Sequence, residues 1–167
     1  MRKIDSLRAT LTAALEELAD DPSRLRVWID RGTAQSRQTA TFGFAMAFRL
    51  NVLLMAMSTD LASVGYVLCA WLRTHQPDLL RPGQDAWSFD LDPLDNGTYD
   101  ALIQLDLTQS ISVAPDAQGT PRLTYLPEPE PLFADALPFA GLPEAPLLKA
   151  IAVVGEGQIA PLDPTHA

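Results

Sequence analysis

The chain has few of the side chains that enzymes and metal proteins depend on. Its 167 residues include one cysteine and two histidines. Cys69 alone cannot form an intramolecular disulfide or a cysteine-based zinc site. Two histidines, one of them the penultimate residue His166, are too few for a histidine-based catalytic centre of the usual kind. The glycine pattern of a phosphate-binding loop is also missing. We therefore expect no catalytic residue, no cofactor, no metal ion and no enzymatic activity.

Basic residues are scarce in the second half of the chain. Residues 82–167 hold two basic and thirteen acidic residues, whereas residues 1–81 hold ten basic and eight acidic ones. The chain thus lacks the surplus of lysine and arginine that phosphate binding requires, and we expect no sequence-specific nucleic-acid binding. The asymmetry has two interpretations. It gives a solvated, soluble surface, or it supports contacts in which the acidic surface of one copy meets a basic surface of the next.

The sequence also lacks a segment typical of a membrane span or a secretion signal. The longest apolar pattern, residues 42–56, has Arg49 and Asn51 in its middle and falls short of the roughly 18 apolar residues of a spanning helix. Near the start, Arg2 and Lys3 are followed by Ile-Asp-Ser instead of an apolar run. We expect no contact with a membrane.

Hydrophobic periodicity predicts two helices, over residues 4–18 and 61–75, because apolar side chains recur there every three or four positions. Pro22 and Pro77 end them, since proline disfavours helical geometry in the residue before it.

Alternating segments predict strands over residues 25–31, 42–56, 87–91, 99–107 and 122–126. Every even residue of 42–56 is apolar, which indicates a strand with one buried face and a bend at Gly43. Residues 31–33 indicate a further bend or bulge. Asn96-Gly97 indicates a tight turn. The order of elements predicts an α+β fold, with an antiparallel or mixed sheet and two helices packed on one face.

The composition divides the chain into three parts. Residues 1–126 form the predicted α+β core. Residues 127–146 are rich in proline and indicate an extended linker. Residues 147–167 are expected to form a C-terminal hairpin extension and tail. Because an isolated hairpin is marginally stable in water, this one should dock on the core, on a neighbouring copy or on a partner.

Three segments of the sequence resemble the tail completion protein R (GpR) family of contractile-tailed bacteriophages, with the likeness covering about residues 4–107. The first is Asp5-Ser6-Leu7-Arg8, followed by Pro22, Leu25-Arg26, Asp30 and Gly32. The second is Phe48-Arg49-Leu50-Asn51-Val52. The third and most specific is Ala70-Trp71-Leu72-Arg73 with Gln76-Pro77-Asp78. Ala56-Met57 departs from the family, where an acidic and an aromatic residue are expected.

This resemblance implies a tail-terminator-like fold and a structural role. Such proteins form a ring, typically of six copies, that caps the head-proximal end of the tail tube. The ring ends polymerisation, ties the last sheath ring to the tube and presents a surface to the head connector. The implied partners are other copies of the chain, tube, sheath and connector proteins. The implied location is the virion tail, with assembly in the host cytoplasm.

The family motifs supply the candidate binding or interface residues, which are Asn51, Trp71, Arg73, Gln76, Pro77 and Asp78. Each also has a purely structural interpretation. The tryptophan fits the core side of its helix, and Asn51 needs a hydrogen-bond partner inside an apolar strand. The Gln-Pro-Asp segment ends a helix. Two other functions stay open: another head–tail joining component or tail tube-like subunit, and a small monomeric binding module.

Overall fold

A computed structural model describes residues 2–36 and 42–129 of the chain. In chain order, its elements are α1 (Arg2–Ala14), α2 (Glu16–Asp20), the 3-10 turn η1 (Pro22–Arg24), β1 (Leu25–Ser36), β2 (Phe44–Met57), α3 (Leu61–His75), the 3-10 turn η2 (Pro77–Leu79), β3 (Ser88–Pro93), β4 (Tyr99–Pro115) and β5 (Pro121–Tyr125). Of the predicted linker, only residues 127–129 are described. The boundary at residue 146 and the predicted C-terminal hairpin lie outside the described residues.

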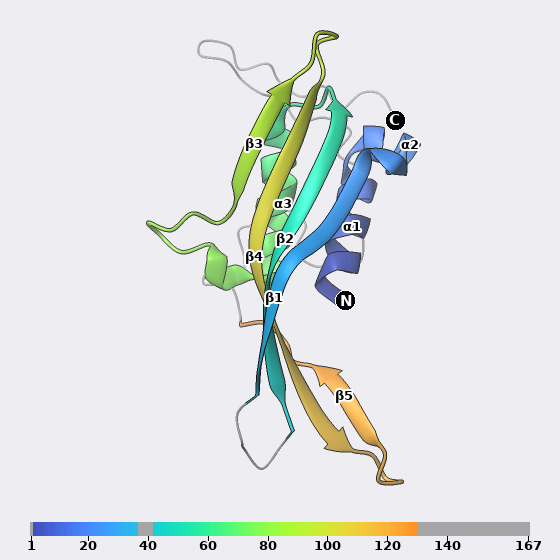
Figure 1. Cartoon of the computed structure of the whole chain (residues 1–167), viewed down its shortest axis with the longest axis vertical. Helices are drawn as coiled ribbons and strands as arrows, with labels where there is room; N and C mark the ends of the chain where they lie inside the picture. Colours follow the sequence, from blue (N-terminus) through green and yellow to red (C-terminus); the bar gives the residue numbers. More distant parts are fainter. Residues whose placement is uncertain (1, 37–41, 130–167) are drawn as a thin grey trace, which may run out of the picture.

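The strands form one antiparallel sheet, and the helices cover one of its faces (Figure 1). Four strands follow the order β1-β2-β4-β3, and β5 pairs with the end of β4. This confirms the predicted α+β class and the packing of α1 and α3 on the same side. The first predicted helix is divided into α1 and α2, because Leu15 between them has extended backbone angles.

Strand β4 carries two partners on a single edge. Ile111 pairs with Phe44 of β2 on one side and with Tyr125 of β5 on the other. Strand β5 therefore lies on the edge of β4 that also holds β3. Pairing with β3 ends at Gln104, and pairing with β5 begins at Ile111. Just after β5, Leu126 still donates to the Ser110 carbonyl oxygen at 2.9 Å, so residues 105–109 leave a gap between the two strands along this edge.

The core lies between the sheet and the helices. It is built from alternate residues of the central strands and from one stripe of each helix, as the periodicity predicts. The side chains that solvent does not reach include Leu7, Leu11, Leu18, Leu50, Leu54, Leu68, Leu72, Ile103 and Leu105.

Two bulges interrupt the regular alternation. One lies in β1 between Ile29 and Gly32, as predicted. The other lies in β2 between Leu54 and Met57, where Ala56 adopts a φ of 51°. An extra residue reverses the alternation, so Met57 is buried in place of Ala56. Gly43, where the sequence predicts a bend within the strand, lies just before β2, which begins at Phe44.

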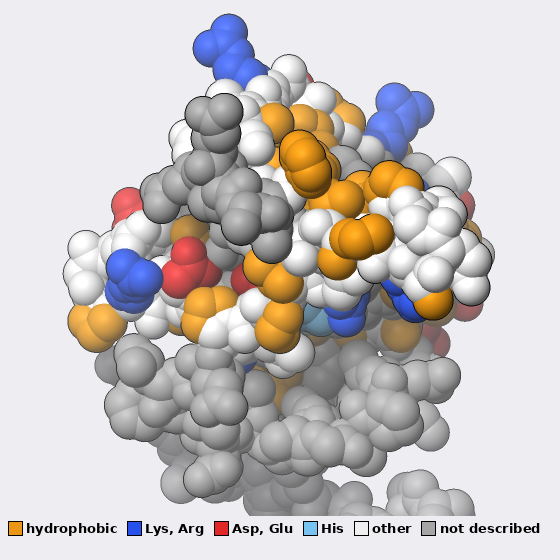
Figure 2. Space-filling view, turned by 90° about the horizontal axis from the view of Figure 1, so that it is seen from below, with side chains coloured by type: hydrophobic (Ala, Val, Ile, Leu, Met, Phe, Trp, Pro, Cys, Tyr) orange, Lys and Arg blue, Asp and Glu red, His pale blue; other side chains and the backbone are white. Residues whose placement is uncertain are grey.

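Two hairpin arms project beyond the helices at the lower end of Figure 1. One arm consists of the β1–β2 pair beyond Gly32, and the other of β4 and β5 beyond Ile111. Seen from this end, apolar side chains gather on the surface (Figure 2). The most exposed of the large ones are Phe42, at 86% exposure, and Leu123, at 61%.

The strained backbone at Ala56 gives a test of the fold. Its amide donates to Asp100 Oδ1 at 2.7 Å, which holds the left-handed conformation in place. Residues with a side chain disfavour that conformation, and β-branched residues do so most. Ala56→Gly should therefore raise the free energy of unfolding by about 0.5 kcal/mol, and Ala56→Val should lower it by more than about 1 kcal/mol. Urea denaturation measures both changes.

Ala45→Gly is the matched control, because Ala45 lies in the regular part of β2. There glycine should lower the stability by about 0.5–1 kcal/mol. A loss of similar size in Ala56→Gly would contradict the left-handed bulge.

Candidate functional site

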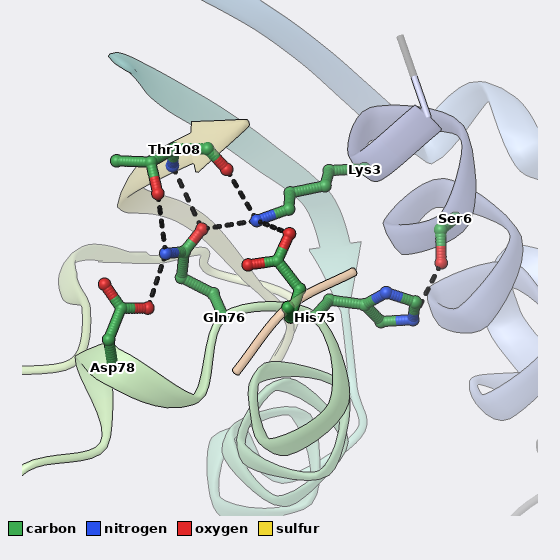
Figure 3. Close-up of polar contacts among 7 residues, drawn as sticks. Lys3, Ser6, His75, Gln76, Asp78 and Thr108 are labelled. Carbon is green, nitrogen blue, oxygen red and sulfur yellow. Dashed lines mark hydrogen bonds and ion pairs between the residues drawn. The ribbon is translucent and has the colours of Figure 1, made fainter. Parts of the chain in front are cut away.

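A buried lysine lies where α1, the end of α3 and strand β4 meet (Figure 3). The side chain of Lys3 is 4% exposed. Its Nζ donates to Gln76 Oε1 at 2.6 Å and to the Thr108 carbonyl oxygen at 2.5 Å, and it forms an ion pair with Glu128 Oε1 at 2.7 Å. Three acceptors match the three protons of an ammonium group. Burial lowers the pKa of Lys3, and the hydrogen bond and charge of Glu128 act in the opposite direction.

The Gln76 side chain hydrogen-bonds to β4 in the part of its edge that pairs with neither β3 nor β5. Its Oε1 accepts the Thr108 amide proton at 3.0 Å, and its Nε2 donates to Thr108 Oγ1 at 2.9 Å and to Asp78 Oδ1 at 2.5 Å. Gln76 and Lys3 together bind the N–H and the C=O of the same residue, between β3 and β5. They replace the strand that is missing there, so these backbone groups are not left unpaired.

This arrangement explains the Gln-Pro-Asp segment as a structural unit. Helix α3 ends at His75, with Gln76 as its C-cap, and Pro77 begins η2. The predicted helix stop is thus confirmed, and Gln76 is 1% exposed. Whether Gln76, Pro77 and Asp78 also contact a partner stays a prediction.

A second polar contact joins α1 to α3. Trp71 Nε1 donates to Ser6 Oγ at 3.1 Å, and the same oxygen lies 3.1 Å from His75 Nε2. The Trp71 and His75 rings stack with centroids 4.7 Å apart. Burial lowers the pKa of His75, and the positive charges of Lys3 and Arg2 lower it further. Trp71 is 3% exposed, as its core interpretation predicts.

The face of the sheet without helices carries a polar row across three strands. Asn51 Nδ2 donates to Asp30 Oδ2 at 2.9 Å, and Gln104 Nε2 donates to Asn51 Oδ1 at 2.9 Å. The partner expected for Asn51 is therefore present. Beside this row, Arg49 donates through two nitrogens to the carboxylate of Asp106, each at 2.8 Å. These hydrogen bonds lower the pKa of Asp106. The pair borders a shallow hollow of about 510 Å³ at the β1 bulge.

The six candidate residues do not form one site. Gln76, Pro77 and Asp78 lie together at the edge of β4, and Trp71 is buried between α1 and α3. Asn51 lies in the polar row on the other side of the sheet. Arg73 of α3 is partly exposed and has a contact within the chain.

Sequence reasoning missed Lys3, Thr108 and Glu128. A signal for Lys3 was present, since it precedes Leu7 and Leu11 at intervals of four and so lies on the buried stripe of α1. Nothing local marks Thr108, because the gap in the edge of β4 exists only once β3 and β5 are in place.

Within residues 2–36 and 42–129, no three histidine, cysteine or acidic side chains are placed to bind one metal ion. None of the described helices has both the length and the apolar character needed to cross a bilayer.

The family model for the P2 phage tail completion protein R (GpR) matches residues 1–129. The chain belongs to this family. It is also similar to the tail completion protein R of Escherichia phage P2, with 31% identity over 134 residues, covering 78% of this chain and 86% of that protein. No solved structure matches.

Family membership confirms the resemblance based on the three sequence segments. In this GpR-family chain, the Asn51 and Trp71–Asp78 segments supply buried contacts that fix the sheet and the end of α3. Ala56, where the resemblance leads us to expect an acidic residue, lies at the left-handed bulge of β2. Aspartate adopts left-handed backbone angles more readily than alanine, so the expected acidic residue would suit the bulge.

The buried lysine predicts a large loss of stability on substitution. Lys3→Met should lower the free energy of unfolding by about 3 kcal/mol, because it leaves the Glu128 carboxylate and the Thr108 carbonyl without their donor. Arg8→Met on the exposed side of α1 is the control, and should change the stability by less than about 0.5 kcal/mol. Urea denaturation followed by circular dichroism measures both. A loss below about 1 kcal/mol for Lys3→Met would contradict the three-acceptor contact.

The lowered pKa of His75 predicts a pH-dependent stability. Below its ordinary pKa of 6.5, the unfolded chain protonates this residue more readily than the folded chain does. The free energy of unfolding should therefore fall as the pH drops from about 7.5 to 5.5. His75→Gln should lose less stability than the wild type over this interval. Denaturation curves at the two pH values test this, and equal losses would contradict it. His166 is present in both proteins, so its contribution cancels.

Proposed function

We propose that this protein is a structural component that completes a phage tail. Copies of the chain form a ring at the head-proximal end of the tail tube, stop its polymerisation and present a surface to the head connector. The observation that carries the proposal is the family match over residues 1–129, together with a relative named tail completion protein R. The ring and its position are part of the proposal.

The chemistry of the described surface supports a role in protein contacts. Lys3, Gln76 and Asn51 are buried and committed to contacts within the chain. The groups available to partners are strand edges, exposed apolar side chains and charges. These groups suit strand addition and complementary docking. Strand edges, exposed apolar side chains and charges are sufficient for a structural, non-enzymatic role.

The two hairpin arms are the proposed contact with the tail. They project from one end of the molecule, and Phe42 and Leu123 expose apolar surface there (Figures 1 and 2). Clustered apolar exposure is typical of protein–protein contacts. We assign the arms to the last ring of tube and sheath subunits. The protein would then reside in the virion tail after assembly in the host cytoplasm.

Deletion of the gene tests the role. Particles made without this protein should have tails of abnormal length or tails that cannot join heads, as seen by negative-stain microscopy. The wild-type protein supplied in trans should restore joined particles. Leu123→Asp should fail to do so, because a charge replaces apolar contact area on the arm. Thr124→Asp adds the same charge at the next exposed position of β5 and should restore them.

Other outcomes identify the competing functions. Normal tails beside leaking heads would indicate a connector. Normal, infectious particles would contradict a tail role and favour the monomeric binding module.

A further inference from the structure

The outer strands of the sheet run in opposite directions. Each neighbouring pair along β1-β2-β4-β3 is antiparallel, so β1 and β3 are antiparallel to each other. If a second copy is placed beside the first by a rotation about an axis along the strands, its β1 therefore lies antiparallel to β3. The sheet can then continue from one copy to the next with every neighbouring pair of strands antiparallel.

Strand β3 has an apolar side and an acidic side. Phe89 and Leu91 pair with the buried residues Ile103 and Ala101, so they lie on the helix side of the sheet. They are 49% and 44% exposed, and the Phe89 ring keeps this exposure although its centroid lies 5.6 Å from that of Trp87. Asp90 and Asp92 alternate with them and lie on the side without helices. All six residues of β3 are exposed.

Strand β1 also has an apolar side, and its opposite side carries a basic residue. Val27 and Ile29 lie on the helix side and are half-buried, since they pair with the buried residues Val52 and Leu50. Arg26 lies on the opposite side and is exposed. Within the described part of the chain, neither Arg26 nor Asp90 makes an ion pair. Arg26 and Asp90 thus expose opposite charges on the same face of the two edges, whereas Asp30 on that face of β1 accepts hydrogen bonds from Trp28 and Asn51.

We infer that β3 of one copy pairs with β1 of the next and extends the antiparallel sheet between subunits. The register that aligns Phe89 with Val27 of the neighbour places Asp90 opposite Arg26. Apolar side chains then meet on one face and opposite charges meet on the other, and each kind of cross-strand pair is favourable. The straight part of β1, Leu25–Ile29 before the bulge, is close to β3 in length.

This contact joins two different surfaces, so it repeats from copy to copy. A repeated heterologous contact makes a closed ring when its rotation closes. The inference deepens the proposed function, on which it rests for the position of the ring. The interface itself is tested on the purified full chain.

Charge reversal separates edge pairing from other modes of association. Asp90→Arg places two arginines across every contact, and Arg26→Asp places two aspartates there. Each variant alone should therefore self-associate at least about tenfold more weakly than the wild type. An equimolar mixture should assemble again, because every contact between the two different variants pairs an arginine with an aspartate. Light scattering and native mass spectrometry should show assemblies in which the two variants alternate.

Asp95→Arg in the β3–β4 turn and Arg122→Asp in β5 are the matched controls, since they change the net charge equally at exposed positions away from the two edges. Both should associate as the wild type does. Circular dichroism checks that every variant is folded.

The remaining outcomes overturn the inference. They are single variants that assemble like the wild type, a mixture that does not recover, and a wild-type chain that stays monomeric at every concentration reached. The first two leave the tail-completion role intact if deletion still gives defective tails. Normal particles after deletion would instead refute the proposed function, whatever the purified protein does.

Discussion

The pairing of strand β4 is the constraint on which the rest of the structure depends. One edge of β4 pairs with β2 from Tyr99 to Ile111, and the other edge is shared by β3, the Gln76 and Lys3 side chains, and β5. Each partner comes from a different part of the chain. The N-terminal helix, the end of α3 and Glu128 all meet at the level of Thr108. A single strand thus fixes the helices, the central sheet and the start of the projecting arm.

Polar side chains that bind within the chain are not available to partners. The lysine, glutamine and asparagine that sequence motifs or burial single out hold the fold together. In the part of the chain that the structure describes, the groups open to partners lie at the edges of β1 and β3 and on the two arms. A sheet that exposes Arg26 on one edge and Asp90 on the other suits a subunit that is repeated around an axis, and arms at one end suit contact with a different component.

The sequence predicts the elements well because their signals are local. Periodicity locates both long helices and the alternating strands, and Asn96-Gly97 marks the turn of the β3–β4 hairpin. Prediction from the sequence fails where the position of a side chain depends on pairing between residues far apart in the chain. Lys3 and Thr108 are 105 residues apart in the chain, and their contact exists because β3 stops before β5 begins. The left-handed Ala56 also gives no local signal, because alanine is a poor choice for that conformation and is held there by Asp100.

The central claim is that the chain acts as a repeated subunit at the end of a tail, joined through its sheet edges. Electron cryomicroscopy of the head-proximal end of intact tails measures this directly. The account predicts a ring of copies of this chain above the last tube subunits, with β3 of each copy beside β1 of its neighbour and the hairpin arms against the tail. Tails in which this chain is absent from that end, or present as isolated copies with both sheet edges facing solvent, would contradict it.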